Sequence, residues 1–227
     1  MKIQQNTSVI FLYHHLGLGD HFVCNGLIRH FMKKFNATRL YLPTKKKNLS
    51  TVQKIYSDDS RILCLPVHTD YDVPNLIELM LNPTIIQVGF AKCRDDWDVS
   101  FYDSVDTPFS VRWSEFKINR DYDREKNIKT LLGLNDEPYI VVHDVGSIGK
   151  FDISLPNDKR IVRIENITDC LLDWCGIIEN ADEVHCVDSS VIHLAQTLNV
   201  KRGVYHNIRT KSTLFCLKDG WETVKYE

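Results

Sequence analysis

The residues best suited to chemistry follow a short apolar run at 183–187, in the order Asp188-Ser189-Ser190. Beyond them apolar side chains recur three and four positions apart, which predicts a helix that begins directly at the end of a strand. Aspartate and serine cap such a helix and leave its first backbone N–H groups facing outward. These N–H groups and the helix dipole favour a negative charge. The junction therefore predicts a phosphate or diphosphate site, to which His193 can add a donor.

The negative charge of Asp188 would repel a phosphate, so we expect this side chain to cap the turn. The backbone N–H groups of Ser189 and Ser190 would then bind the anion. Lys150, in the glycine-containing loop 145–150, would add a positive charge. The same residue types also cap helices that bind nothing, so a purely structural junction is the alternative.

A second candidate site is the glycine-rich turn that follows the apolar run at 9–13 and opens a predicted helix. Gly17 and Gly19 match the start of a dinucleotide-binding fingerprint, but Phe22 occupies the position that needs a third small residue. The second predicted strand also lacks the acidic residue of that fingerprint, so NAD binding is not expected. We expect the two glycines to allow a tight turn and the approach of a bulky ligand. Asp20 is then either a helix cap or a general base.

Three histidines surround this turn and are alternative bases. Imidazole titrates closer to neutral pH than a carboxylate, so His14, His15 or His21 could accept a proton in place of Asp20. We assign His15 and His21, with the glycines of the turn, to the acceptor side of the site.

Predicted strands alternate with predicted helices along the chain, which is typical of parallel sheets built from βαβ units. Strands are expected at 9–13, 39–42, 61–65, 84–89, 139–143, 160–164, 183–187 and 203–206. Helices are expected at 21–35, 48–57, 73–81, 123–132, 169–178 and 191–198. We expect 91–120 to be irregular. The pattern predicts an α/β protein with two Rossmann-like lobes, 1–118 and 119–227, whose parallel sheets face a central cleft.

Two further groups of residues lie where a ligand could reach them. The segment Arg163-Ile164-Glu165 ends the strand next to the diphosphate junction, and we expect it to border the base of a nucleotide, with an ordinary sheet edge as the alternative. Arg112 is a weaker candidate for the cleft.

Composition limits the partners. The formal net charge of −2 predicts no basic surface for nucleic acid or anionic membranes. Seven cysteines without a C-x-x-C pair favour thiols in a reducing compartment over a disulfide framework or a zinc site. No apolar run approaches the ~20 residues of a membrane span, and the run at 9–13 is too short for a signal peptide. We therefore expect a cytoplasmic protein.

The two motifs, in this order, resemble those of GT-B-fold glycosyltransferases of the heptosyltransferase-like family, family 9. The N-terminal lobe of that family opens with a strand, a glycine-aspartate turn and a long helix, as at 17–20 here. Its C-terminal lobe carries a strand, then Asp, Ser or Thr, a small residue, two further residues and His, as at 188–193 here.

The resemblance implies that Asp20 acts as the general base near the acceptor. It also implies that Asp188, Ser189, Ser190 and His193 hold the diphosphate of the donor. Ser190 stands where the family usually has glycine, which would narrow the phosphate site. The chain is also shorter than typical members, so the resemblance does not identify the acceptor.

We therefore expect an enzyme that transfers a sugar from a nucleotide-diphosphate sugar to a hydroxyl group, with inversion and without a metal or a cofactor. One alternative is a non-catalytic nucleotide- or sugar-binding module of the same fold. Another is a metal-dependent transferase of the GT-A type, whose D-x-D signature is matched by Asp96-Trp97-Asp98. A third is a dehydrogenase or epimerase, which would require NAD.

Overall fold

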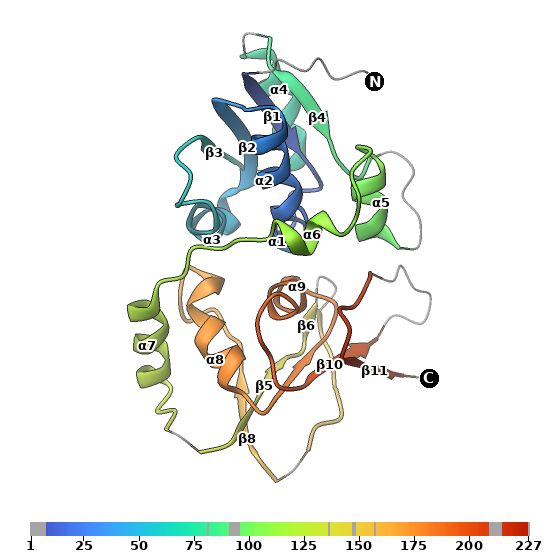
Figure 1. Cartoon of the computed structure of the whole chain (residues 1–227). Coiled ribbons are helices and arrows are strands. Elements are labelled where there is room, and N and C mark those ends of the chain that lie inside the picture. The colour runs from blue at the N-terminus through green and yellow to red at the C-terminus, as the bar shows by residue number, and fades with distance from the viewer. Residues whose placement is uncertain are drawn as a thin grey trace. The chain divides into compact units, whose positions relative to one another are not determined.

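The computed structural model describes residues 8–80, 82–90, 96–135, 137–146, 149–156, 158–208 and 215–226. These residues form two compact units, coloured in chain order in Figure 1. The N-terminal unit runs to Asn119 and includes Phe215 and Cys216. The C-terminal unit starts at Arg120 and includes the chain again from Leu217 on. The chain thus returns once to its first unit before it ends.

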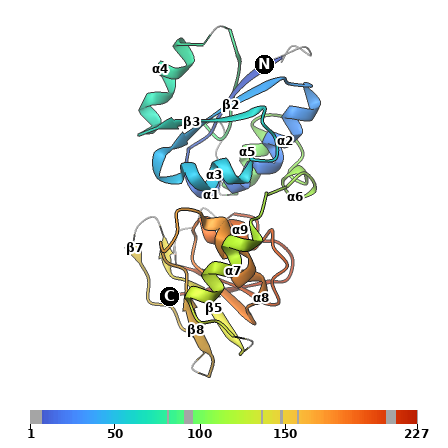
Figure 2. The ribbon, with the colours of Figure 1, turned by 90° about the vertical axis from the view of Figure 1, so that its left-hand side faces the viewer.

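The N-terminal unit contains a four-stranded sheet in the order β3-β2-β1-β4. Its strands are parallel and comprise β1 (Val9–Tyr13), β2 (Arg39–Lys45), β3 (Ile62–Val67) and β4 (Thr84–Gln87). The helices between and after them are α1 (Leu18–Val23), α2 (Asn25–Lys34), α3 (Leu49–Ile55), α4 (Val73–Glu78), α5 (Trp97–Asp103) and α6 (Val111–Ser114). Figure 2 shows α3 and α4 on opposite sides of β2 and β3, as right-handed crossovers require.

The strand order of this sheet reverses between β1 and β4. Chain connections run from β1 toward β3 on one side and return to β4 on the other. At such a switch point the loops after the two strands separate, and ligands of open α/β sheets bind there, beyond the carboxyl ends of the strands. The turn that carries Asp20 follows β1 directly.

The C-terminal unit contains a five-stranded sheet in the order β11-β10-β9-β5-β8, again with parallel pairing. Its strands are β5 (Tyr139–His143), β8 (Arg160–Arg163), β9 (Glu183–Cys186), β10 (Gly203–Asn207) and β11 (Trp221–Lys225). The order reverses between β5 and β9, so the switch point of this sheet lies where β5 and β9 end.

The two faces of the second sheet are covered differently. One face is covered by helices: the hydroxyl of Tyr139 donates to the carbonyl oxygen of Ile177 in α8 (Cys175–Asn180), and α7 (Tyr122–Leu131) packs on α8. On the other face, a coil takes the place of a crossover helix. Its side chains at 151, 153 and 155 pack on Ile140 and Val142 of β5. A short hairpin, β6 (Val145–Gly146) and β7 (Gly149–Lys150), precedes this coil.

Several predicted elements differ from the structure in their bounds. The expected helix 21–35 starts earlier, at Leu18, and is broken at Cys24 into α1 and α2. The segment 91–120 is not wholly irregular, because it contains α5 and α6; residues 91–95 lie outside the described residues. The expected helix 169–178 is a 3₁₀ turn, η3 (Leu171–Trp174), followed by α8.

Three further differences concern the second unit. The expected loop 145–150 is the β6–β7 hairpin, of which residues 147 and 148 lie outside the description. The junction helix is α9 (Ser190–Ala195). Strand β11 was not predicted, because its residues form no apolar run, in keeping with their exposed and half-buried positions.

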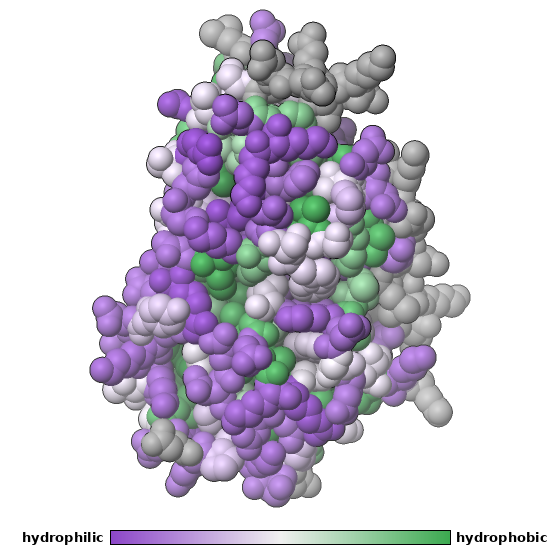
Figure 3. All heavy atoms as spheres, in the orientation of Figure 1, coloured by the Kyte–Doolittle hydropathy of each residue, from purple (hydrophilic) through white to green (hydrophobic). Residues whose placement is uncertain are grey.

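Hydrophilic side chains cover much of the face drawn in Figure 3, with smaller apolar areas between them. Among the described residues, no helix has the length and apolar character needed to cross a membrane.

Candidate functional site

The strongest candidate site of the C-terminal unit lies at the switch point of its sheet, where β5 and β9 end. His143 is the last residue of β5, and Ser189 is the N-cap residue of α9. Nδ1 of His143 and Oγ of Ser189 are 3.0 Å apart. The ends of two neighbouring strands are therefore joined by side chains at the position where open α/β sheets bind ligands.

We expected Asp188 to cap this turn and the N–H groups of Ser189 and Ser190 to bind the anion, and the structure makes Ser189 the N-cap residue of α9. The N-cap side chain makes no hydrogen bond to the first turn of the helix. Its hydroxyl bonds to His143 instead, because extended backbone at Ser189 turns the side chain toward β5. No side chain of the N-cap residue therefore satisfies the first-turn N–H groups of α9.

The imidazole of His143 is neutral at pH 7. Burial lowers its pKa to about 4, although the carboxylate of Asp144 acts in the opposite direction. A neutral ring can accept a hydrogen bond from the Ser189 hydroxyl or donate one to it. It contributes no net charge to the site.

The β6–β7 hairpin brings the predicted Lys150 to this edge of the sheet. A Cβ atom on Gly146 would lie 3.3 Å from the carbonyl oxygen of Asp188 and 3.2 Å from the ring of Phe151. Glycine therefore lets the hairpin pass close to the Asp188 turn. Lys150 is exposed, and its Nζ is 4.0 Å from Oδ2 of Asp144.

Asp144 holds two cations together at the end of β5. Its carboxylate is buried and accepts a hydrogen bond of 2.5 Å from Nη1 of Arg163. Arg163 and Lys150 thus flank the carboxylate of Asp144. With Asp188 on the neighbouring turn, the two cations are matched by two carboxylates in number. Cations in this arrangement are suited to phosphate oxygens.

The remaining predicted donor-site residues belong to α9 and its entry. Asp188 directly precedes the N-cap, and Ser190 is the first residue of the helix. His193 lies on the same helix and is buried. Because α9 has six residues, its dipole is short, and the electrostatic attraction of this edge depends more on Lys150 and Arg163.

An open pocket of about 370 Å³ runs along β8, the edge strand of the sheet. Arg163 and Glu165, both predicted to border a nucleotide base, line it. Ile164 is buried, and its N–H donates to the carbonyl oxygen of Val142 in β5. Alternation along the strand therefore turns the main-chain polar groups of Arg163 and Glu165 toward the open edge.

In the N-terminal unit, Asp20 belongs to a capping box at the start of α1. Its Oδ2 accepts a hydrogen bond of 2.9 Å from the backbone N–H of Gly17, the N-cap residue. A Cβ atom on Gly17 would lie 2.5 Å from this oxygen. Glycine is required here to let the carboxylate approach the backbone, and Asp20 remains half-buried.

Neither of the two glycines of the tight turn before α1 is left-handed. Gly17 has φ −70°, and Gly19 lies inside α1. The left-handed residue is Leu16, with φ 56°. Its side chain is buried, and its N–H donates a hydrogen bond to Nδ1 of His14. The burial and the hydrogen bond together stabilise this unfavourable backbone conformation.

The three histidines of this turn have different surroundings. His15 is exposed; its Nε2 lies 2.9 Å from the carbonyl oxygen of Gly89, and its ring stacks on Phe90. Both residues follow β4, so His15 joins the two strand ends of this switch point. His14 and His21 are buried with their rings 4.4 Å apart.

Burial determines the charge of this histidine pair. It lowers the pKa of His14 to about 3 and that of His21 well below its usual value. A buried His21 does not present its ring to an acceptor, so the structure places it in the core below the turn and not on its surface.

The D-x-D triplet and Arg112 form a buried ion pair. Asp98 and Arg112 are almost completely buried and bonded to each other. The Asp98 carboxylate also accepts hydrogen bonds from the N–H groups of Val99 and Cys216. A metal at Asp98 would have to displace a guanidinium, and Arg112 does not reach a ligand surface.

Sequence reasoning missed His143 and Asp144. Both end or follow a predicted strand, as Asp188 does, so the rule that polar residues at the carboxyl ends of parallel strands form sites would have identified them. No recognisable helix start follows them, so the pattern in this unit drew attention to the end of β9 and to Lys150, and not to the end of β5 itself.

Comparisons with known proteins address the fold. No family model matches the sequence, and no curated protein matches it. The structure resembles that of a glycosyl transferase family 9 protein from Veillonella parvula DSM 2008, with a TM-score of 0.66 and 10% identity over 100% of this chain and 90% of the other. It also resembles the iron-containing dodecameric glycosyltransferase TibC from enterotoxigenic E. coli H10407, with a TM-score of 0.50 and 10% identity over 88% of this chain and 58% of the other. The chain therefore has a fold like that of glycosyltransferase family 9, as its motifs indicated.

Proposed function

We propose that the protein is a glycosyltransferase that moves a sugar from a nucleotide-diphosphate sugar to a hydroxyl acceptor. The observation that carries the proposal is the group of polar and cationic residues at the β5–β9 switch point, on a fold like that of family 9. A diphosphate is the leaving group of this reaction, and positively charged donors that face it stabilise the charge that develops.

The donor diphosphate is assigned to the C-terminal unit. Lys150 supplies an exposed ammonium group, Ser189 supplies a hydroxyl that His143 orients, and the N–H groups of Ser189 and Ser190 add neutral donors. Arg163 lies between this group and the pocket on β8, which we assign to the nucleotide base. His193, on α9, is buried, so we propose for it a supporting place below this site and no direct contact with the donor.

The acceptor is assigned to the N-terminal unit, with Asp20 as general base. Its carboxylate is fixed by Gly17 at the carboxyl end of β1, and His15 lies on the same edge of the sheet. A fixed carboxylate that accepts the hydroxyl proton during attack contributes about 10²–10⁴-fold to the rate.

One base and no covalent intermediate give direct displacement, so we propose inversion at the anomeric carbon. We also propose that turnover needs no divalent metal, because Lys150 and Arg163 are available to neutralise the diphosphate. A reducing compartment such as the cytoplasm suits the free thiols of Cys24, Cys64, Cys175 and Cys186.

A panel of nucleotide diphosphates and their sugars, read by thermal shift, tests the donor assignment. One nucleotide should raise the melting temperature more than the others, since a ligand that binds only the folded state stabilises it. Asp20→Asn should keep this shift and lose about 10²–10⁴-fold in sugar transfer. EDTA should leave transfer by the unaltered protein unchanged.

The outcomes separate the competing functions. Nucleotide binding without transfer to any acceptor would identify a non-catalytic module. Full activity of Asp20→Asn would overturn the base assignment. Copurified NAD would point to an oxidoreductase.

A further inference from the structure

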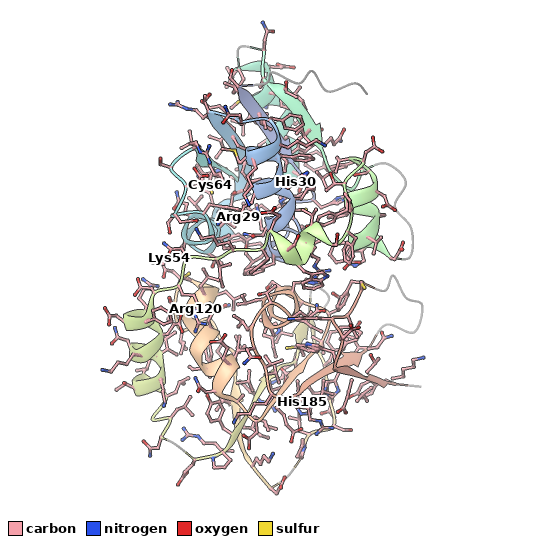
Figure 4. The ribbon with its side chains drawn as sticks, viewed as in Figure 1. Arg29, His30, Lys54, Cys64, Arg120 and His185 are labelled. Atoms are coloured by element: carbon pink, nitrogen blue, oxygen red, sulfur yellow. The ribbon has the colours of Figure 1, made fainter. Side chains whose placement is uncertain are left out.

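Four side chains form a continuous hydrogen-bonded chain on the coil-covered face of the second sheet. Glu183 and His185 belong to β9, His206 belongs to β10, and Tyr226 follows β11. The link from Glu183 Oε2 to His185 Nε2 is 3.2 Å, and that from His185 Nδ1 to His206 Nε2 is 2.9 Å. His206 Nδ1 and the Tyr226 hydroxyl are 2.6 Å apart. Figure 4 marks His185 on this sheet.

The chemistry of the first link fixes the direction of all the others. An ionised carboxylate only accepts, so Nε2 of His185 must carry a proton and donate it to Glu183. Nδ1 of neutral His185 then accepts from Nε2–H of His206, and Nδ1 of His206 accepts from the Tyr226 hydroxyl. Both histidines are therefore the Nε2–H tautomer.

Both rings are neutral at pH 7, as this order requires. Burial lowers the pKa of His206 to about 4 and also lowers that of His185. A second proton on His185 would set its Nδ1–H against the Nε2–H of His206. A second proton on His206 would instead reverse the last link, because the Tyr226 hydroxyl can also accept.

Ion pairs fix the Glu183 end of the chain. Nζ of Lys159 lies 3.1 Å from Oε1 of Glu183, and Nη1 of Arg202 lies 2.7 Å from Oε2. Arg202 also pairs with Glu222 on β11. The carboxylate is thereby held as an acceptor at a fixed place, and the chain starts from a rigid point of the sheet.

The Tyr226 end of the chain holds the coil that follows the β6–β7 hairpin. The N–H of Ser154 donates to the Tyr226 hydroxyl over 3.2 Å. Residues on either side of Ser154 pack with Tyr226 in one apolar cluster. At its other end the coil joins the site, because the Phe151 N–H donates to the carbonyl oxygen of Asp144 and the Phe151 ring lies below Gly146.

The geometry points to a positioning role: Glu183, His185, His206 and Tyr226 hold the coil 151–156, and through it the hairpin that carries Lys150, beside the Asp188 turn. They act through the coil and do not touch a ligand. That the four residues position Lys150 for donor binding rests on the proposed function. That they fix the coil 151–156 does not depend on it.

A polar chain at this place needs a reason beyond stability. Buried polar groups can often be replaced by apolar ones of similar volume without loss of stability. The hydrogen bond from the Ser154 N–H to the Tyr226 hydroxyl is directional. It therefore fixes the position of the coil along the sheet, which apolar packing alone would leave adjustable.

Long-range ¹H–¹⁵N spectra of the whole protein at pH 7 test the order of the chain. We expect both His185 and His206 as the neutral Nε2–H tautomer. An Nδ1–H tautomer or a charged ring at either position would overturn it.

Substitutions test the hold on the coil, with hydrogen exchange of 150–156 as the readout. Tyr226→Phe should speed exchange about fivefold, the worth of one hydrogen bond. His206→Phe should do the same, and His206→Gln should restore slow exchange because an amide both accepts and donates. Tyr139→Phe is the control, since it removes a buried tyrosine hydroxyl on the helix-covered face of the same sheet. Equal exchange in Tyr226→Phe, Tyr139→Phe and the unaltered protein would overturn the role.

Binding of ADP, UDP and GDP to the same variants tests the link to the donor site. The best binder should weaken about threefold to tenfold in Tyr226→Phe and stay unchanged in Tyr139→Phe. Faster exchange with unchanged binding would overturn this link. If none of the three binds the unaltered protein, the donor assignment fails, and the exchange and tautomer results still decide the positioning role.

Discussion

Nδ1 of His143 lies 3.0 Å from Oγ of Ser189, and this contact joins the ends of β5 and β9. The two strands are neighbours in the sheet but 40 residues apart in the chain, since β5 ends at 143 and β9 begins at 183. The hydroxyl is therefore oriented by a ring that no local pattern would connect to it. The side chain of Ser189 makes no hydrogen bond to the first turn of α9.

Ser189→Ala should weaken nucleotide-diphosphate binding about tenfold, because one hydroxyl donor to a charged group is lost. The backbone N–H groups of the turn remain, so binding should not vanish. Isothermal titration measures the effect. Thr130→Ala, which removes an exposed hydroxyl from α7 in the same unit, should bind as the unaltered protein does. Equal affinity of the two variants would remove Ser189 from the donor site.

The sheets and their switch points were predictable because strands alternate with helices and each strand has its own apolar run. The predicted strand 139–143 matches β5 in full, and the polar residues after β1 and β9 were recognised as candidate sites. Both follow from local periodicity and from the rule that sites lie beyond the carboxyl ends of parallel strands.

The partners of the site residues were not predictable, because they depend on contacts between distant segments. The hydroxyl of Ser189 bonds to His143, a residue that the sequence pattern did not connect with this junction. Asp98 fitted a metal signature and instead pairs with Arg112. His21 was expected beside the acceptor, and the packing of α1 buries it against His14. Local pattern identifies which residues are polar, and tertiary packing decides what they bind.

Lys150→Ala should weaken binding of a nucleotide diphosphate about tenfold, and the loss should shrink as salt is raised. The reason is that its ammonium group is exposed at the switch point and, at 4.0 Å, makes only a long contact with Asp144, so its charge acts on anions through water. Lys201→Ala removes another exposed lysine from the same unit, one that pairs with Asp182 before β9, and should change nothing. An equal loss of affinity in Lys150→Ala and Lys201→Ala would mean that the net charge of the protein, and not a site at Lys150, attracts the nucleotide.

Gly17→Ala should reduce sugar transfer at least tenfold while nucleotide binding stays unchanged. The new Cβ atom would lie 2.5 Å from Oδ2 of Asp20, so the carboxylate must move and lose its bond to the backbone. Gly133→Ala provides the control for stability. Gly133 has φ 59° and open space around it, so alanine there costs about 1–2 kcal/mol through backbone strain alone. Normal transfer by Gly17→Ala would mean that the position of Asp20 is unimportant.

The stability of the fold should fall as the pH drops below about 6.5. Burial lowers the pKa of His14 to about 3, so from pH 6.5 down to that value only the unfolded state binds a proton at this residue. Each pH unit in that range costs up to about 1.4 kcal/mol for this histidine. Above pH 6.5 the ring is neutral in both states and contributes no pH dependence.

His14→Asn should make the fall less steep. Asparagine keeps an acceptor for the Leu16 N–H and cannot take up a proton. Urea unfolding at pH 7, 6 and 5 measures how the free energy of unfolding changes with pH. A loss of stability caused by the shorter side chain lowers all three values equally and does not alter this slope. An unchanged slope would show that His14 binds a proton equally in the folded and unfolded states.

Arg112→Met should destabilise the N-terminal unit by about 3–5 kcal/mol, because it leaves the carboxylate of Asp98 buried without its cation. Arg61→Met is the matched control. Arg61 also pairs with an aspartate, Asp59, but its side chain is 46% exposed, and such a pair is worth less than about 1 kcal/mol. Chemical unfolding measures both variants.

Adding Asp98→Asn to Arg112→Met should restore much of the lost stability, since the charge that lacks a partner is then removed. A metal-binding role for the triplet predicts the opposite behaviour. Asp98→Asn alone would then leave the fold intact and abolish a turnover that depends on Mn²⁺ or Mg²⁺. An intact fold in Arg112→Met, together with metal-dependent transfer, would show that Asp98 is a ligand and that its contact with Arg112 contributes little.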